Sequence, residues 1–461
     1  MTTIPCDPIG PKGIAEFGRA LRAREVSAEE VTKAYLERIS ALDPKLNAFE
    51  YVAADQAVKA ARAIDNLLAA GIDLGPLMGV PVGVKDLLAV DGMPTTGGSL
   101  TDVTDLIGRE GSFIKGLKRA GCVILGKTTC VEFAFGTLGV NRLRTPWNPC
   151  DPKVKRIPGG SSSGSAVAVA AGLCAFAIGT DTGTSVRLPA ALCGVFGLRT
   201  NSELWPTDGV FPLAPVMDSI GPLTKSAADA AIVYAALTGD SIPEAAPVGG
   251  LRLGKPADYY YESLDPEVDF CMSAALAKLA DAGVEIAPVR VPEAKEREIY
   301  FPTALPAYAL GILGRERYQR DRDKMDPIVA ARVGSGFDIQ ASDFVQQELR
   351  RKALEKTMER RMDGYDAWVV PTSALVARPA EDFSDVERGM PLTLAIAQAT
   401  QPGSMFGQCG SSIPIHGLGS KLPVGLHVVC RRHEVAKALS VSLAIEDIIG
   451  IPSQPDLTGF L

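Results

Sequence analysis

Gly159-Gly-Ser-Ser-Ser-Gly-Ser-Ala166 opens the most informative part of this chain. Residues 166–173, which follow this polar loop, have high helix propensity, and residues 174–178 are an apolar run typical of a buried strand. A second polar loop, Gly179-Thr-Asp-Thr-Gly-Thr-Ser-Val-Arg187, comes directly after that strand. Open α/β sheets hold their ligands in loops at the ends of buried strands, so these two loops predict an α/β core and the place of its functional site.

Helical and strand-like patterns alternate through much of the remaining chain. Ser27-Ala-Glu-Glu30 matches a capping box and predicts a helix that runs to about residue 42. The other predicted elements are a helix over 53–70, a strand within 80–90, a helix over 112–120, strands over 122–125, 366–371 and 422–430, and a helix over 433–448. Alternation of this kind predicts a largely parallel sheet.

The middle of the chain has a different composition. From about residue 241 to 365, charged helical patterns such as 313–324 and 344–361 replace the glycine-bearing loops, and the core pattern then returns. No linker-like stretch separates these parts. The chain of 461 residues, 46% of them hydrophobic, is therefore predicted to form a single domain over 1–461, in which the helical segment 241–365 packs over the core.

Charge and cysteine usage argue against several classes of protein. The formal net charge is −7 and the basic residues are scattered, so no nucleic-acid partner is expected. No run approaches the roughly 20 apolar residues that a membrane span requires, so no membrane partner is expected either. The nine cysteines lie mostly in apolar runs without CxxC pairs, which is typical of reduced thiols in a cytoplasmic protein.

Histidine is too scarce to suggest a metal centre. The chain has three histidines, His416, His427 and His433, all near its C-terminal end. His427 and Cys430 stand three positions apart in a predicted strand, so their side chains should point to opposite faces of the sheet. No metal ion and no other cofactor is expected.

Lys85 is the candidate base for a reaction that does without histidine. Hydrolysis of an amide needs an activated nucleophile, a proton shuttle and donors for the developing oxyanion, and a desolvated lysine can act as a base. Lys85 lies in Gly79-Val-Pro-Val-Gly-Val-Lys-Asp86, a run with little other charge. Taken alone, it is more simply explained as a surface lysine at a strand end.

Four blocks of sequence together resemble the amidase signature family. They are Gly79 to Leu87 around Lys85, Gly159 to Ala166, Gly179 to Ala190, and Cys193-Gly-Val-Phe-Gly-Leu198. Their order and spacing are also similar to the family's, and the recognisable core runs from about residue 77 to 223. The resemblance implies a large mixed, mostly parallel sheet flanked by helices on both faces, and an activity against amides.

The same resemblance implies a catalytic triad. Ser185 would be the nucleophile, Ser161 the bridging serine after a cis peptide bond at Gly160–Ser161, and Lys85 the base that begins the proton relay. The backbone N–H groups around the nucleophile would form an oxyanion hole, and neighbouring residues would brace the loop. The hole would comprise Thr182, Gly183, Thr184 and Ser185, and the bracing residues would be Thr180, Asp181 and Ser162.

Some positions depart from the family pattern. Thr184 stands where the family usually has glycine, so either its φ is negative or the loop is reshaped. The run that begins at Arg199 and the segment 401–414 are also unfamiliar, which points to differences in the substrate pocket. Residues 133–138 and 403–410 are apolar or small, so a small neutral amide is favoured as the substrate, with water as the second reactant.

Other readings stay open at this point. A carbamate or urea could replace the amide, and the chain could be the amidase subunit of a tRNA-dependent amidotransferase. A different class of function is phosphate or nucleotide binding by the Gly159–Gly164 loop before its helix, although that loop lacks the lysine of a P-loop. A non-catalytic scaffold is disfavoured because all three triad positions are intact. A homodimer is left open as the oligomeric state.

Overall fold

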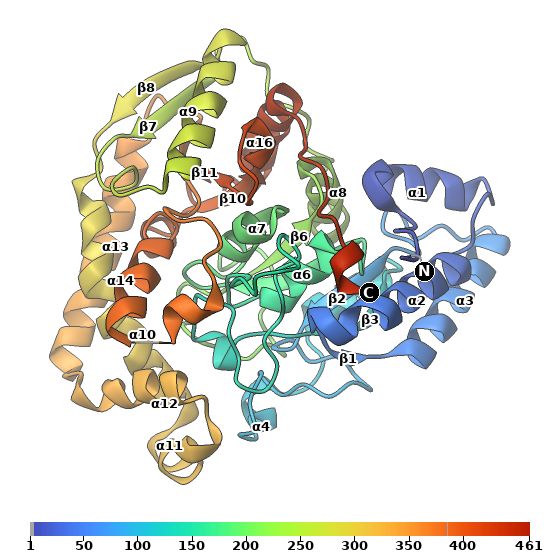
Figure 1. The fold of residues 1–461 in the computed structure, drawn as a ribbon, viewed down its shortest axis with the longest axis horizontal. Helices are drawn as coiled ribbons and strands as arrows, with labels where there is room; N and C mark the ends of the chain where they lie inside the picture. The colour runs from blue at the N-terminus through green and yellow to red at the C-terminus, as the bar shows by residue number, and fades with distance from the viewer. Residues whose placement is uncertain (1–3, 385) are drawn as a thin grey trace.

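Strands from the whole length of the chain build one mixed sheet in the computed structural model, which describes residues 4–384 and 386–461 (Figure 1). The strands are β1 Phe49–Val52, β2 Pro81–Lys85, β3 Val123–Thr128, β4 Phe176–Asp181, β5 Phe196–Arg199, β6 Ser219–Thr224, β7 Arg252–Pro256, β8 Glu285–Val289, β9 Ala367–Pro371, β10 Cys409–Pro414 and β11 Gly425–Cys430. Their order across the sheet is β1-β3-β2-β4-β6-β5-β10-β11-β9-β7-β8. The predicted α/β class with a large mixed sheet is confirmed.

Parallel pairing lies in two parts of the sheet, β3–β2–β4 and β8–β7–β9. The other neighbouring strands pair antiparallel. The sheet therefore contains more antiparallel pairing than the sequence predicted. The reason is that β5 and β6, like β10 and β11, follow one another without an α-helix between them, and parallel neighbours need such a crossover.

Helices surround this sheet (Figure 1). They are α1 Gly13–Arg22, α2 Ala28–Leu46, α3 Ala54–Ala69, α4 Thr104–Ile107, α5 Ser112–Arg119, α6 Ser163–Ala170, α7 Arg187–Cys193, α8 Ala227–Thr238, α9 Pro266–Asp281, α10 Arg297–Leu313, α11 Arg315–Asp321, α12 Pro327–Gly334, α13 Ala341–Arg361, α14 Val386–Ile396, α15 Gln401–Met405 and α16 Val435–Ile449. The predicted capping box is confirmed, since the Ser27 side chain accepts from Glu30 N–H and the Glu30 side chain accepts from Ser27 N–H. None of these helices is long and apolar enough to cross a membrane.

Helices cover both faces of the sheet, as expected. Gly197 of β5 faces α7, because a side chain at this position would meet Ala190. Its neighbours Phe196 and Leu198 point to the opposite face, into an apolar core shared with α8 and α16. The central strands are thus buried from both sides, which explains their near-continuous apolar sequences.

The middle segment, 241–365, contains strands as well as helices. Its strands β7 and β8 extend one edge of the sheet, where only helical structure was expected. The helix predicted over 313–324 is interrupted: Leu313 ends α10 because Gly314 adopts a φ of 81°, and the following residues form α11 and a 3-10 helix, Arg322–Lys324.

The two glycine-bearing loops meet at the centre of the sheet. Helix α6 begins at Ser163, three residues earlier than predicted, and β4 extends to Asp181. Thr180 and Asp181 therefore lie on a strand rather than in the second loop. Only residues 182–186 connect β4 to α7, so this connection is short and held at both ends.

Candidate active site

Lys85 is the last residue of β2, and its side chain is fully buried. Its Nζ lies 2.7 Å from the hydroxyl oxygen of Ser161 and 2.8 Å from that of Thr180. The interpretation of Lys85 as a surface lysine is therefore wrong. Strand β2 thus positions the buried amine of Lys85 where the two loops meet.

The environment of Lys85 favours its neutral form. Burial lowers the pKa of Lys85 to about 8, and the more distant Cys130, Asp181 and Asp218 oppose this shift only in part. No carboxylate of the described residues forms an ion pair with it, whereas nearby Lys127 is paired with Asp86 at 2.9 Å. About a tenth of Lys85 is thus uncharged at pH 7 and able to accept a proton, and this fraction grows as the pH rises toward 8.

Ser161 follows a cis peptide bond with Gly160, as the resemblance implied. Its carbonyl oxygen accepts a hydrogen bond from Val131 N–H at 3.1 Å, and Gly160 N–H donates to the carbonyl of Thr137 at 2.7 Å. Both contacts tie the first loop to the segment that follows β3. The Ser161 hydroxyl is thereby fixed beside Lys85.

Ser185 lies in the connection between β4 and α7 and is 5% exposed. Its carbonyl oxygen accepts a hydrogen bond from Ser162 N–H at 3.1 Å, so the two loops are joined next to both serines. The Ser185 hydroxyl has no hydrogen-bond partner among the described residues. In particular, it is not hydrogen-bonded to the Ser161 hydroxyl. The structure thus brings Lys85 and Ser161 into contact and leaves Ser185 close by with its hydroxyl free.

Consecutive backbone N–H groups around Ser185 are also free. No described residue accepts a hydrogen bond from the N–H of Thr182, Gly183, Thr184 or Ser185, although all four residues are buried. Buried N–H groups without partners are rare in folded proteins. Such a row of donors is suited to an anionic oxygen.

The orientation of the Thr184 N–H is fixed by contacts to the carbonyl oxygen of the same peptide unit. The carbonyl oxygen of Gly183 accepts hydrogen bonds from Arg187 Nη2 and from the Ser404 hydroxyl, each at 3.0 Å. A trans peptide unit is planar and carries its C=O and N–H on opposite sides. The Thr184 N–H therefore points away from Arg187. Thr184 itself lies outside the left-handed region, so threonine is accommodated with a negative φ.

Asp181 anchors this connection through buried charges. Its carboxylate pairs with Arg187 and Arg199, each at 3.0 Å, and accepts hydrogen bonds from the N–H groups of Val186 and Arg187. Burial would raise the pKa of Asp181, but the two guanidinium groups outweigh it and hold that pKa well below its usual value. The sequence predicted the bracing role of Asp181 but missed both arginines, whose only signal is a charge within an apolar run.

Thr180 and Ser162 are hydrogen-bonded to each other, which ties β4 to the first loop. Thr180 N–H donates to the Ser162 hydroxyl oxygen at 3.3 Å, and that hydroxyl lies 3.2 Å from the Thr180 carbonyl oxygen. Since Thr180 also accepts from Lys85, it links the lysine to the first loop. It therefore contacts the lysine directly, which was not predicted.

The unfamiliar segment 401–414 packs behind the second loop. It folds as α15 and β10, and α15 supplies Ser404 to the Gly183 carbonyl. A side chain at Gly183 would meet Phe301 of α10 at 2.9 Å and the Gln401 side chain at 3.6 Å. The second loop is thus enclosed by residues from α10 and α15, and position 183 has room only for glycine.

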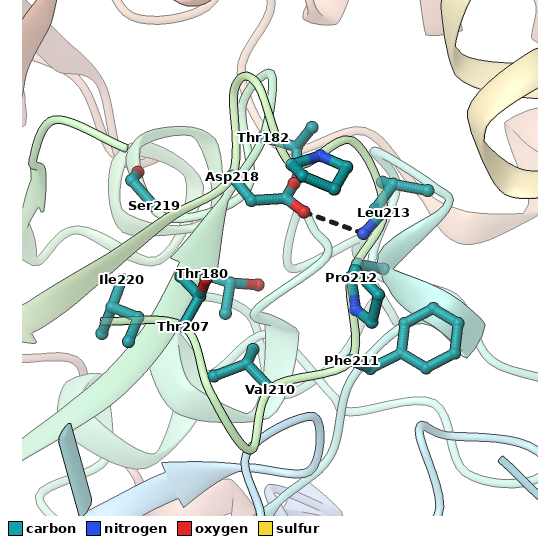
Figure 2. Close-up of a pocket in the computed structure, with 12 residues that line it drawn as sticks. Thr180, Thr182, Thr207, Val210, Phe211, Pro212, Leu213, Asp218, Ser219 and Ile220 are labelled. Atoms are coloured by element: carbon teal, nitrogen blue, oxygen red, sulfur yellow. Dashed lines mark hydrogen bonds between the residues drawn. The ribbon is translucent and has the colours of Figure 1, made fainter. Parts of the chain in front are cut away.

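A cavity of about 80 Å³ borders the second loop, with Thr180 and Thr182 in its wall (Figure 2). Asp218 also lines it, and its carboxylate lies 2.6 Å from the Thr182 hydroxyl and 2.8 Å from Leu213 N–H. Burial raises the pKa of Asp218. The described residues contain no group of three or more histidine, cysteine or acidic side chains that could hold a metal ion.

Comparison with known proteins identifies the family to which the chain is similar. A family model described as Amidase matches residues 30–434. The 2-amino-5-chloromuconic acid deaminase of Comamonas testosteroni is 33% identical over 443 residues, which cover 95% of this chain and 96% of that protein. A glutamyl-tRNA(Gln) amidotransferase subunit of Heliobacterium modesticaldum is 30% identical, over 96% of this chain and 98% of that protein.

A solved structure agrees with these matches. One amidase crystal structure superimposes with a TM-score of 0.88 at 30% identity and covers 95% of this chain and 100% of that chain. Sequence and fold thus match the same group of proteins over nearly the whole length. This chain belongs to the amidase signature family, whose members hydrolyse amide C–N bonds.

Proposed function

We propose that Ser185 attacks the carbonyl carbon of a small amide, with Lys85 and Ser161 relaying its proton. Neutral Lys85 accepts the Ser161 proton while Ser161 accepts the Ser185 proton, and the Ser185 oxygen bonds to the substrate carbon. The N–H groups of residues 182–185 donate to the carbonyl oxygen as it becomes negative. The product of this step is a tetrahedral intermediate on Ser185.

The same relay then serves the departing nitrogen. The proton returns from Lys85 through Ser161 to the nitrogen as the C–N bond breaks, so that a neutral amine or ammonia leaves and an acyl-enzyme remains. A water molecule attacks the acyl carbon and gives its proton to the relay. Ser185 regains its proton when the carboxylic acid departs.

One observation carries this proposal. A fully buried lysine without an ion pair to any described residue lies 2.7 Å from a serine hydroxyl, beside a second serine at a row of free N–H groups. Structural lysines in a core are paired, as Lys127 is with Asp86. The absent Ser161–Ser185 hydrogen bond does not oppose the proposal, because catalytic hydrogen bonds often tighten only when substrate binds.

The phosphate-binding alternative has less support. A phosphate on the Gly159–Gly164 loop would need free backbone N–H groups. The N–H groups of Gly160, Ser162 and Gly164 already donate to the carbonyls of Thr137, Ser185 and Thr129. The loop is also fully buried, which leaves no surface for a nucleotide.

Several classes of substrate are compatible with the proposed reaction. A carboxamide is the first candidate, and a carbamate or urea remains an alternative for the same machinery. The amidotransferase relative suggests a second role, in which the chain works as an amidase together with partner proteins. Glutaminase activity that appears only with a copurified partner would favour that role over a stand-alone hydrolase.

Further expectations from the sequence stay proposals. We propose a single domain over 1–461 with a signature core at 77–223, and a cytoplasmic location, which the nine free cysteines support. A homodimer is also proposed, and the molar mass from light scattering would test it.

Trapping of the acyl-enzyme tests the proposed function. The wild-type protein is incubated with a mixed library of amides and carbamates and quenched in acid, and its intact mass is measured. We expect an acyl adduct on Ser185 and none in Ser185→Ala. A fluorophosphonate probe should label the same residue. Turnover that persists in folded Ser185→Ala would contradict the proposal.

A further inference from the structure

A small cavity lies between the end of β4 and the connection from β5 to β6 (Figure 2). Its volume is about 80 Å³. Thr180 and Thr182 line it from β4 and the second loop, and Thr207 and Pro215 line it from the connection. Both Thr207 and Pro215 are exposed on the surface of the protein. The cavity therefore reaches from the second loop to the surface.

Thr180 connects this cavity to the proposed proton relay. Its hydroxyl oxygen lies 2.8 Å from Lys85 Nζ, and the hydroxyl oxygen of Ser161 lies 2.7 Å from the same nitrogen. Two contacts to one nitrogen make these hydroxyls neighbours. In the proposed reaction Ser161 gives its proton to the leaving nitrogen, so that nitrogen must lie within hydrogen-bond reach of Ser161. The cavity thus begins beside the group that protonates the leaving nitrogen.

The second loop borders the cavity on the side of the developing oxyanion. Thr182 lines the cavity, and its N–H is the first of the donors at residues 182–185 that no described residue occupies. In the tetrahedral intermediate the leaving nitrogen is bonded to the same carbon as the oxyanion, so it lies close to these donors as well as to Ser161. The cavity adjoins both groups, and it is therefore placed to receive the leaving nitrogen.

Asp218 supplies the cavity with a carboxyl group (Figure 2). The Thr182 hydroxyl lies 2.6 Å from one of its oxygens, and the N–H groups of Leu213 and Ala214 donate to the other at 2.8 and 3.0 Å. A carboxylate has about four acceptor positions, of which these contacts occupy three. Asp218 forms no ion pair with a described residue, and burial raises its pKa. A donor or cation that enters the cavity would use the remaining position and favour the ionised carboxylate.

The volume of the cavity limits what it can hold. A cavity of about 150 Å³ encloses one benzene ring, whereas this one measures about 80 Å³. Val210 and Phe211 form part of its apolar wall, and the Phe211 ring stacks on Phe133 with the ring centroids 5.3 Å apart. Stacking fixes the Phe211 ring, so the wall resists expansion. Ammonia or an amine with one or two carbons fits this space, and an aromatic ring does not.

We infer that the cavity is the leaving-group site, that it takes ammonia or a small aliphatic amine, and that Asp218 accepts a hydrogen bond from the departing nitrogen. This inference rests on the proposed function. Once the C–N bond is broken, the free amine takes a proton from water and becomes a cation, which the carboxylate attracts. An aromatic amine stays neutral in water near pH 7 and gains no such attraction. The substrates are thus primary amides and N-methyl amides, and anilides are excluded.

Amides of one acid with different leaving groups test the size limit. The acid is the one identified by the trapping experiment, and its primary amide, N-methyl amide and 4-nitroanilide are compared, so that contacts of the acyl group cancel. The primary amide should exceed the nitroanilide at least about 100-fold in kcat/KM, although nitroaniline is the better leaving group in solution. Val210→Ala should raise the nitroanilide-to-primary-amide ratio about five- to tenfold.

Val216→Ala is the matched control. Val216 lies in the same connection, is 39% exposed and does not line the cavity. This variant should leave the ratio unchanged. A wild-type enzyme that hydrolyses the nitroanilide as fast as the primary amide would overturn the leaving-group site, as would equal ratios in folded Val210→Ala and Val216→Ala.

Transfer of the acyl group to an added amine tests the role of Asp218. Formation of the C–N bond is the reverse of its cleavage, so an amine in the cavity attacks the acyl carbon, the bond to Ser185 Oγ breaks, and the relay carries one proton from the nitrogen to that oxygen. Transfer to methylamine should saturate as its concentration rises, and transfer to aniline should not. Asp218→Asn should raise the half-saturating methylamine concentration about tenfold.

The outcomes separate the two proposals. Saturable transfer to aniline would overturn the size limit, and an unchanged half-saturating concentration in folded Asp218→Asn would overturn the role of Asp218, because a purely structural defect lowers hydrolysis and transfer together. The Val210→Ala ratio decides on the cavity even where Asp218→Asn does not fold. Absence of an acyl adduct on Ser185 during turnover would instead overturn the proposed function.

Discussion

The hydroxyl of Thr184 donates a hydrogen bond to the carbonyl oxygen of Gly160 over 3.1 Å. Each of these residues directly precedes a serine of the proposed triad, so the contact fixes the Ser185 loop against the Ser161 loop. Thr184 is the position at which this chain departs from the glycine that the resembled family usually has. The departure therefore supplies a contact that glycine cannot make.

Removal of this hydroxyl should slow the chemistry. Thr184→Val has a similar shape but cannot donate to Gly160, so we expect kcat to fall about five- to tenfold while KM changes less than about twofold. Thr184→Ser keeps the donor and should restore most of kcat. Steady-state kinetics on one substrate decide between these results. Equal activity of the Val and Ser variants would show that the hydroxyl has no positioning role.

The pH dependence of catalysis should report Lys85. In the proposed relay the neutral amine of Lys85 is the base, and burial lowers the pKa of Lys85 to about 8. The kcat/KM should therefore rise with pH up to an apparent pKa near 8 and fall about tenfold per pH unit well below it. Lys85→Ala should lose about 10³-fold or more in kcat.

A pH-rate profile between pH 6 and 10, with the fold checked at each pH by circular dichroism, tests this expectation. A rate that is flat from pH 6 to 9, or wild-type activity in Lys85→Ala, would exclude Lys85 as the base.

The candidate triad could be proposed from the sequence because its members lie in contiguous motifs. Lys85, Ser161 and Ser185 each stand in a short block whose neighbours, glycine and small polar residues, are themselves informative. Contacts that depend on distant parts of the chain were missed. Arg187 bonds to Ser404, 217 residues away, and Arg332 contacts Phe135 across 197 residues. A single sequence holds no signal for such pairs until the fold brings them together.

The fold, like the candidate site, was predicted where local sequence patterns determine it and missed where distant parts of the chain determine it. Local patterns predicted α2, with its Ser27–Glu30 capping box, and five strands, β2, β3, β4, β9 and β11. The direction of each strand depends on how the chain crosses the sheet, which is why antiparallel pairs such as β5–β6 were not foreseen. Strands β7 and β8 were missed because they lie among longer helices.

The buried charges around Asp181 should be essential for stability. Asp181→Asn would leave Arg187 and Arg199 without a counter-ion in the core, so we expect the free energy of unfolding to fall by about 3–5 kcal/mol. Asp323→Asn is the control, because Asp323 is 94% exposed and should change the stability by less than about 0.5 kcal/mol. Thermal and urea unfolding at pH 7 measure both. A loss below about 1 kcal/mol in Asp181→Asn would show that the arginines find other partners.

Glu446 should make the protein less stable as the pH rises. Its carboxyl group on α16 accepts hydrogen bonds from Ala227 N–H at the start of α8, at 3.1 and 2.9 Å to its two oxygens, and burial raises its pKa from 4.5 to about 7. The folded state thus binds the proton more tightly than the unfolded state. The stabilisation is complete below about pH 4.5 and is lost as the pH rises to about 7, by about 3 kcal/mol in total.

Urea unfolding of the wild type and of Glu446→Gln at pH 5 and pH 8 isolates this effect. Glutamine keeps an oxygen acceptor for Ala227 N–H and does not titrate, so the difference in stability between the two proteins should shift by about 2 to 3 kcal/mol in favour of Glu446→Gln at pH 8. Other titrating groups are common to both proteins and cancel in this difference. If the two proteins lose stability in parallel between pH 5 and pH 8, Glu446 is ionised at pH 5 and the N–H groups of α8 stabilise its charge.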